Sequence, residues 1–165
     1  MIEICTVFDR NYALFGIAMM KSLQDNCNQE IYWRILALDN PTQFMLNTLQ
    51  LENLEVLTED DIDNVNLLEL KQERNHLEYC WSLASILLDY QNKHSKFKSL
   101  LAYIDADIFF YNDIMKSLEV LQRANIAIHE HRFTNDAWIS SQKVGRFNVG
   151  MIAGKYSKEF SDCIN

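Results

Sequence analysis

The chain contains 165 residues, of which 48% are apolar, a size and composition sufficient for one domain with a single core. Its formal charge of -8 and sequence pI of about 4.9 disfavour the broad cationic surface that binds nucleic acid, so no nucleic-acid partner is expected. No apolar run approaches the roughly 18 residues of a membrane-spanning helix, which leaves only peripheral membrane association open. The four cysteines form no C-x-x-C pair, and we interpret them as reduced thiols of a cytoplasmic protein.

Apolar runs of strand length alternate with segments of helical spacing along the chain. The predicted strands are residues 2–8, 31–38, 54–57, 99–111, 125–129 and 147–153. The predicted helices are residues 12–25, 40–51 and 78–90, the second of them opened by Asn40 and Pro41 as cap and first turn. This alternation predicts an α/β fold with a mostly parallel central sheet flanked by helices.

The end of the chain, KYSKEFSDCIN, has the pattern of a helix that opens without a closing cap. We therefore expect one domain over residues 1–165 that is truncated at its C-terminus.

Polar side chains occur where predicted strands end. Asp9, Asn11 and Tyr12 follow the first strand, Asp105 and Asp107 interrupt the fourth, and Asn148 lies in the last. Ligands of parallel α/β sheets bind beyond the carboxyl ends of the strands, so these residues are the first candidates for a site.

Asp105 and Asp107 are spaced so that, in an extended strand, both carboxylates point to the same side. Two hard oxygen ligands in this arrangement suit one Mg²⁺ or Mn²⁺ ion. The alternative is that the two acids only cap the end of the strand or accept backbone N–H groups, and a bare D-x-D does not decide between these readings.

The stretch YIDADIFF at 103–110 resembles the D-x-D strand of GT-A glycosyltransferases. Similarity to the family-eight and related bacterial nucleotide-diphospho-sugar transferases continues in TVFDRNYALFGIAMMKSL at 6–23, EYCWSLASILL at 78–88 and GRFNVGMIAGK at 145–155. These segments follow the order of that family along nearly the whole chain. The resemblance implies a Rossmann-like GT-A fold and a glycosyltransferase of polysaccharide biosynthesis. It further implies a manganese or magnesium ion, a nucleotide-sugar donor (a UDP-sugar) and a saccharide or lipid-linked acceptor.

The resemblance also assigns roles to single residues. It places the nucleotide against Thr6, Asp9, Asn11, Tyr12 and Asp105, with the Tyr12 ring available for the base. It makes Asp105 and Asp107 metal ligands, Asp107 bridging the ion to the diphosphate, and turns Asn148 toward the transferred sugar or the acceptor. Trp138, in the polar stretch TNDAWISSQK, is a candidate to stack on an acceptor sugar. No residue is identified as catalytic, and Tyr12 read alone is an ordinary core aromatic.

Two departures from the family pattern leave the activity of these 165 residues open. The helix before the D-x-D reads CWSLAS where the family has a basic residue that meets the phosphates, and the family's further histidine ligand lies beyond the end of this chain. One alternative is therefore a truncated module that binds a nucleotide sugar without transferring it. A phosphatase of the haloacid dehalogenase type is disfavoured, because its D-x-D lies near the start of the domain and continues with a small hydroxyl residue, whereas Ile108 and Phe109 follow here.

Overall fold

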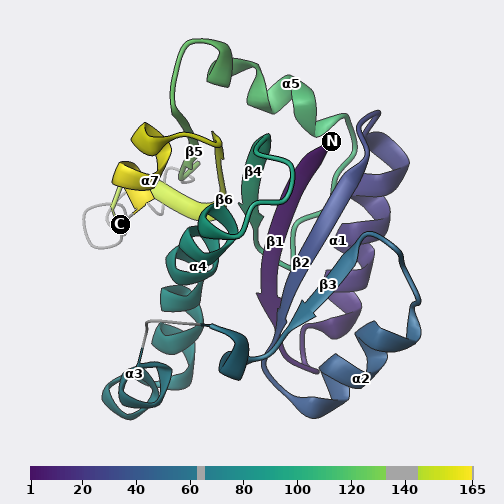
Figure 1. Ribbon diagram of the computed structural model, residues 1–165, viewed down its shortest axis with the longest axis vertical. Helices are drawn as coiled ribbons and strands as arrows, with labels where there is room; N and C mark the ends of the chain where they lie inside the picture. The colour runs from purple at the N-terminus through teal and green to yellow at the C-terminus, as the bar shows by residue number, and fades with distance from the viewer. Residues whose placement is uncertain (63–65, 133–144, 165) are drawn as a thin grey trace.

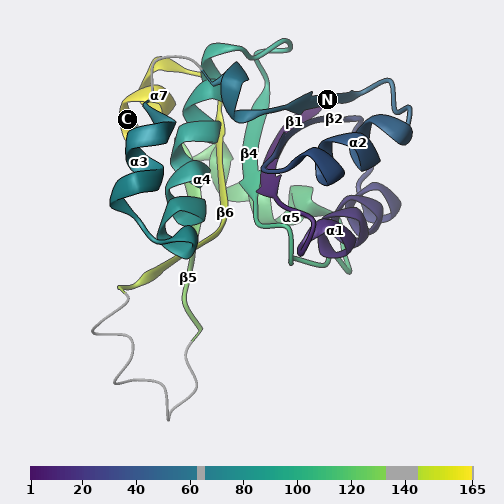
Figure 2. The same ribbon diagram turned by 90° about the horizontal axis from the view of Figure 1, so that it is seen from below.

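A computed structural model describes residues 1–62, 66–132 and 145–164. One six-stranded sheet lies between two layers of helices (Figures 1 and 2). The strand order across the sheet is β3-β2-β1-β4-β6-β5. The strands are β1 (Ile2–Phe8), β2 (Ile31–Ala37), β3 (Leu54–Leu57), β4 (Leu100–Ile104), β5 (Ile126–Glu130) and β6 (Phe147–Lys155).

Four neighbouring strands run parallel, and a returning strand interrupts this pattern. β1 pairs in parallel with both β2 and β4, and β2 pairs in parallel with β3. β6 pairs antiparallel with β4 on one side and with β5 on the other. This confirms the predicted α/β fold with a mostly parallel sheet. It also brings the start of β6 to the edge where β4 ends.

The helices cover both faces of the sheet (Figure 2). One face is covered by α1 (Ala13–Asn26), α2 (Asn40–Thr48) and α5 (Ile114–Leu118), whose apolar side chains form a core with Ile2, Ile4 and Phe8 of β1. The other face is covered by α3 (Leu67–Glu73), α4 (His76–Lys93) and α7 (Lys158–Ile164), which pack against Cys5 and Val7. Because β1 is buried on both faces, its residues are apolar except for Glu3 and Thr6. No helix in the described part of the chain is long and apolar enough to cross a membrane.

The N-cap of helix α2 lies one residue before the predicted cap. Asp39, not Asn40, is the N-cap, and its carboxylate accepts a hydrogen bond from the Thr42 amide at 2.9 Å. Pro41 stands in the first turn as expected, because its missing N–H costs nothing there. The helix ends at Thr48 rather than near Leu51.

Strand β4 is much shorter than the predicted segment 99–111. It ends at Ile104, and the Ile108 amide donates to the Asp105 carbonyl at 3.3 Å, closing a turn over the D-x-D. The prediction that both acids stand in an extended strand is therefore wrong. Phe109 and Tyr111, which we assigned to the strand, are exposed outside the sheet and contact each other with ring centroids 4.9 Å apart.

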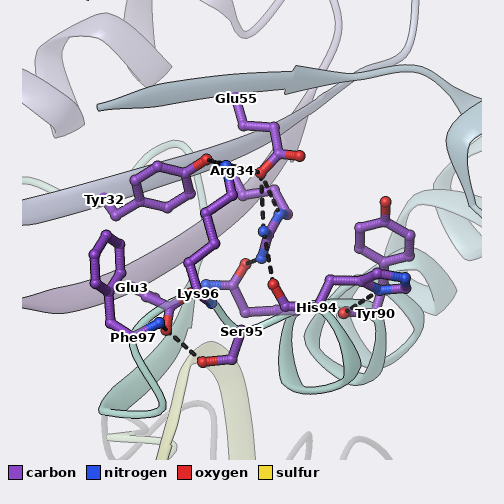
Figure 3. Close-up of polar contacts among 10 residues, drawn as sticks. Glu3, Tyr32, Arg34, Glu55, Tyr90, His94, Ser95, Lys96 and Phe97 are labelled. Atoms are coloured by element: carbon purple, nitrogen blue, oxygen red, sulfur yellow. Dashed lines mark hydrogen bonds and ion pairs between the residues drawn. The ribbon is translucent and has the colours of Figure 1, made fainter. Parts of the chain in front are cut away.

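A buried polar network ties the end of α4 to the amino ends of the parallel strands (Figure 3). Arg34 on β2 is 1% exposed and donates to the Glu55 carboxylate from Nε at 3.0 Å and from Nη2 at 2.8 Å. Its guanidinium also donates to the Gln91 side chain and to the His94 carbonyl. The buried Glu3 carboxylate accepts from the amides of Lys96 and Phe97 at 3.1 and 3.2 Å. The network thereby fixes the connection between α4 and β4.

Candidate functional site

The sheet brings three predicted polar clusters to one edge. Strand β1 lies directly beside β4, with Cys5 opposite Tyr103, so the turn after Phe8 lies next to the turn after Ile104. On the other side of β4, Ile104 pairs with Met151 of β6, and Asn148 precedes Met151 by three residues. Asp9 and Asp105 thus directly follow β1 and β4, and Asn148 lies near the start of β6, the next strand in the sheet. All three are at the carboxyl edge of the parallel strands, where α/β proteins bind ligands.

Asp9 organises the turn between β1 and α1. Its Oδ1 accepts hydrogen bonds from the amides of Asn11 at 2.9 Å and Tyr12 at 3.3 Å, and its Oδ2 accepts from Asn11 Nδ2 at 2.9 Å. The carboxylate therefore shapes this turn through the local bonds typical of aspartate. The turn leaves the Tyr12 ring 49% exposed, with the Phe15 ring 5.8 Å away between centroids. An exposed, laterally supported ring at this edge can stack on a planar base.

The next residue, Arg10, links this turn to the end of β2. Its Nε donates to Asp39 Oδ2 at 3.0 Å, and its backbone amide donates to the same oxygen at 3.2 Å. Burial raises the pKa of Asp39, but the bonds from Thr42 and the charge of Arg10 outweigh it and lower the pKa overall. Arg10 is thus directed away from Asp9 and toward the α2 cap.

Sequence reasoning missed the start of helix α4 as part of this edge. Asn75 and Glu78 form a reciprocal capping box, and His76 follows the cap directly. His76 Nε2 lies 3.8 Å from Asp9 Oδ2 and 3.8 Å from Cys80 Sγ. Burial, followed by the charge of Asp9, raises the pKa of the Cys80 thiol. The N-x-x-E spacing at 75–78 was the available signal for this helix start, two residues before the predicted one.

Asp105 is held through both its backbone and its side chain. Its amide donates to the Gly150 carbonyl at 2.9 Å, and its Oδ1 accepts from the Tyr103 hydroxyl at 2.9 Å. Burial and the nearby charge of Asp107 raise the pKa of Asp105, against the opposing effect of the Tyr103 hydrogen bond. Asp107 is exposed in the adjoining turn. Within the described ranges, no lysine or arginine forms an ion pair with either acid.

Gly150 separates Asp105 from Asn148. A Cβ atom placed on this glycine would lie 3.4 Å from Asn148 Nδ2 and 3.7 Å from Asp105 Oδ2. The side-chain Oδ1 of Asn148 accepts a hydrogen bond from the Gly150 backbone amide at 3.4 Å, and Nδ2 of the same side chain faces the Cβ position of Gly150. The glycine therefore leaves a small gap lined by a hydrogen-bond donor, the Ile108 Cδ1 methyl at 3.5 Å and a carboxylate.

No family model matches the chain. The uncharacterized protein YfnF of Bacillus subtilis strain 168 is 30% identical over 168 residues, a match that covers 97% of this chain and 54% of YfnF. YfnD of the same strain is 23% identical over 159 residues, covering 96% of this chain and 51% of YfnD. The chain thus spans about half the length of these curated relatives.

Solved structures decide the architecture. The galactosyltransferase LgtC, in complex with donor and acceptor sugar analogues, gives a TM-score of 0.67 at 16% identity, covering 96% of this chain and 59% of LgtC. Mouse xyloside xylosyltransferase 1 gives 0.59 at 13% identity, covering 99% and 71%. The glycosyltransferase GlyE of Streptococcus pneumoniae TIGR4 gives 0.59 at 17% identity, covering 98% and 36%. The chain has the GT-A fold. This confirms the fold predicted from the D-x-D context.

Of the two remaining sequence candidates, only Thr6 belongs to the part of the chain that the structure describes. Thr6 is fully buried in β1 and therefore lies beneath the surface of the carboxyl edge. Its hydroxyl has no hydrogen-bond partner in the described structure. Trp138, the predicted acceptor-stacking residue, lies outside the described residues.

The acids at this edge could provide part of a divalent cation site. Over the described ranges, no three histidine, cysteine or acidic side chains gather closely enough to hold a metal ion by themselves. Asp105 and Asp107 nevertheless provide two hard oxygen donors; burial and then the charge of Asp107 raise the pKa of Asp105, and in the described ranges neither acid is ion-paired with a lysine or arginine. Such a pair suits Mg²⁺ or Mn²⁺, which commonly takes one or two protein carboxylates and completes its shell with water and phosphate oxygens.

Proposed function

We propose that this chain binds a nucleoside diphosphate sugar at the carboxyl edge of the GT-A sheet and takes part in transfer of the sugar to a saccharide or lipid-linked acceptor. The observation that carries the proposal is the juxtaposition of the Asp9 turn, the uncompensated Asp105–Asp107 pair and the Asn148–Gly150 gap at one edge. The resemblance to family-eight and related transferases favours a UDP-sugar among the donors.

The residues have separate roles in this proposal. Tyr12 stacks on the base, and the Asp9 turn with Asn11 positions the ribose. Asp107, with Asp105, holds a Mn²⁺ or Mg²⁺ ion, which when bound stabilises the negative charge of the departing diphosphate as a Lewis acid. Asn148 Nδ2 donates to a hydroxyl of the transferred sugar. The three fold neighbours described above are glycosyltransferases, which supports this reading.

A second candidate is a module that binds the nucleotide sugar without transferring it. It is favoured by one observation: within the described ranges, no third histidine, cysteine or acidic side chain joins Asp105 and Asp107 to complete a metal site. Both candidates share the same donor site, so binding is the first property to measure.

The deciding experiment titrates the protein with UDP in the presence and absence of Mn²⁺, following heat of binding and melting temperature. A ligand at a hundredfold excess over its Kd stabilises the native state by about 2.7 kcal/mol. We expect metal-dependent stabilisation in the wild type and its loss in Asp107→Asn. The matched control is Asp162→Asn, which removes an exposed acid of α7 and leaves binding unchanged.

The outcomes separate the candidates. Absence of any metal-dependent effect of UDP contradicts the donor site and agrees with the phosphatase alternative. Binding followed by release of UDP from a panel of donor sugars supports the transferase, and binding without release from any donor supports the module.

A further inference from the structure

Tyr103 connects the interior of the protein to the proposed donor site. Its side chain is 3% exposed and packs in the core beneath α4, while its hydroxyl reaches Asp105 Oδ1 at 2.9 Å. The reach is local, since Asp105 is only two residues further along the chain. A buried, tightly packed ring therefore delivers a fixed hydrogen-bond donor to an acid at the edge.

The two carboxylate oxygens of Asp105 have different surroundings. Oδ1 accepts from Tyr103, and the backbone of Asp105 is held by the Gly150 carbonyl at 2.9 Å. Oδ2 lies 3.7 Å from the Cβ position of Gly150, on the side of Asn148, and the described residues give it no hydrogen-bond donor. Rotation about the terminal carboxylate torsion is otherwise broad, so the bond from the Tyr103 hydroxyl fixes the orientation of the carboxylate and thereby the direction of its second oxygen.

We propose that Tyr103 is a positioning residue that fixes the Asp105 carboxylate with Oδ2 turned toward the ligand. This inference rests on the proposed function and deepens it, because it names the buried group that orients a metal-binding acid. Outer partners of this kind hold metal ligands in place, and their removal costs about 10- to 100-fold in metal affinity. The competing explanation is that the hydroxyl merely satisfies its own buried hydrogen-bonding need.

The test compares two tyrosines that make the same bond at opposite edges of the sheet. Tyr103→Phe removes the bond to Asp105, and Tyr32→Phe removes the 2.9 Å bond to Glu55 at the amino edge (Figure 3). We expect Tyr103→Phe to weaken Mn²⁺-dependent UDP binding by about 10- to 100-fold. We expect Tyr32→Phe to leave it unchanged. Equal binding by Tyr103→Phe and the wild type overturns the inference.

A double-mutant cycle shows whether Tyr103 acts through Asp105. In an Asp105→Asn background, Tyr103→Phe is expected to have no further effect on UDP affinity, whereas an undiminished effect there overturns the inference. Asp105→Glu keeps the charge but displaces the carboxylate by one methylene, and is expected to lose affinity as Tyr103→Phe does. It replaces Asp105→Asn if binding to that variant is too weak to measure, and wild-type affinity in it contradicts the inference. A wild type without metal-dependent binding refutes the proposed function itself, a result distinct from normal binding by the variants.

Discussion

Asp105 Oδ2 and Asn148 Nδ2 approach the same point, the position of an absent Cβ on Gly150, to within 3.7 and 3.4 Å. Gly150→Ala would place a methyl group there at ordinary contact distances. We expect this variant to fold with stability within about 1 kcal/mol of the wild type, because an unstrained Gly→Ala change is neutral or favourable. A misplaced methyl in a binding pocket costs about 1 to 3 kcal/mol, so we expect donor affinity to fall by tenfold or more.

The contrasting variant is Gly154→Ala on the same strand. A Cβ at Gly154 would overlap the fully buried Phe160 ring of α7, so this change is expected to destabilise the fold by about 1 to 3 kcal/mol. Denaturant unfolding and UDP titration of both variants check the pair. A large stability loss in Gly150→Ala would show that its side of β6 is packed rather than open.

Tyr12 is expected to contribute by ring stacking. Tyr12→Ala should reduce UDP affinity by about 1 to 3 kcal/mol, the range measured for aromatic stacking on single bases, while Tyr12→Phe should retain it. Tyr111→Ala is a suitable control, because Tyr111 is 79% exposed and follows Phe110, whose backbone is bonded to Ser22 and Asn26 near the far end of α1. Calorimetric titration measures all three, and equal losses for Phe and Ala would assign the contribution to the hydroxyl instead.

Asp39 should prove to be the residue that starts α2. Asp39→Ala removes the bond to the Thr42 amide and is expected to cost about 1 to 2 kcal/mol, the usual loss for an N-cap. Asn40→Ala, one residue later, should cost little because Asn40 is not the cap. Urea unfolding of the two variants distinguishes them, and the reverse order of stabilities would restore Asn40 as the cap.

Glu55 should make folding sensitive to acid. Burial raises the pKa of Glu55, but the charge of Arg34, the Tyr32 hydroxyl and Lys96 outweigh it, so the pKa in the folded state is below its ordinary value of 4.5. The resulting stabilisation is present above pH 4.5 and is lost as the pH falls through the lowered pKa.

We therefore expect Glu55→Gln to lower stability at neutral pH and to flatten its decline below pH 4.5, measured by urea unfolding across the pH range. The exposed Glu52→Gln serves as the control. A decline as steep in Glu55→Gln as in the wild type would locate the acid sensitivity elsewhere.

The strand and helix order was predictable because three of the parallel strands, β1, β2 and β4, are buried on both faces and so consist largely of apolar residues. The end of β4 was not, since IFFY continues the apolar pattern after Asp107 although Phe109 and Tyr111 lie in solvent. What ends the strand is the turn between Asp105 and Ile108. The residue pattern at 105–108 does not predict that turn.

The candidate site was predictable as a set of residue types but not as a geometry. The D-x-D context pointed to Asp105 and Asp107, and their position beside Asp9 follows from strand order. The hydroxyl of Tyr103 and the approach of His76 to Asp9 depend on side-chain directions and on the start of α4, which sequence spacing does not specify. The same holds for the ion pair of Arg34 and Glu55, which joins the neighbouring strands β2 and β3.

The Arg34 network lies at the amino ends of the parallel strands, and the candidate site lies at their carboxyl ends. The polar bonds that connect α4 to the sheet are therefore at the opposite edge from the candidate site. Substitutions at Tyr12, Asn148 or Gly150 leave those bonds untouched. Such a layout gives the scaffold evolutionary latitude, because residues of the candidate site can change at one edge while the bonds at the other edge preserve the fold.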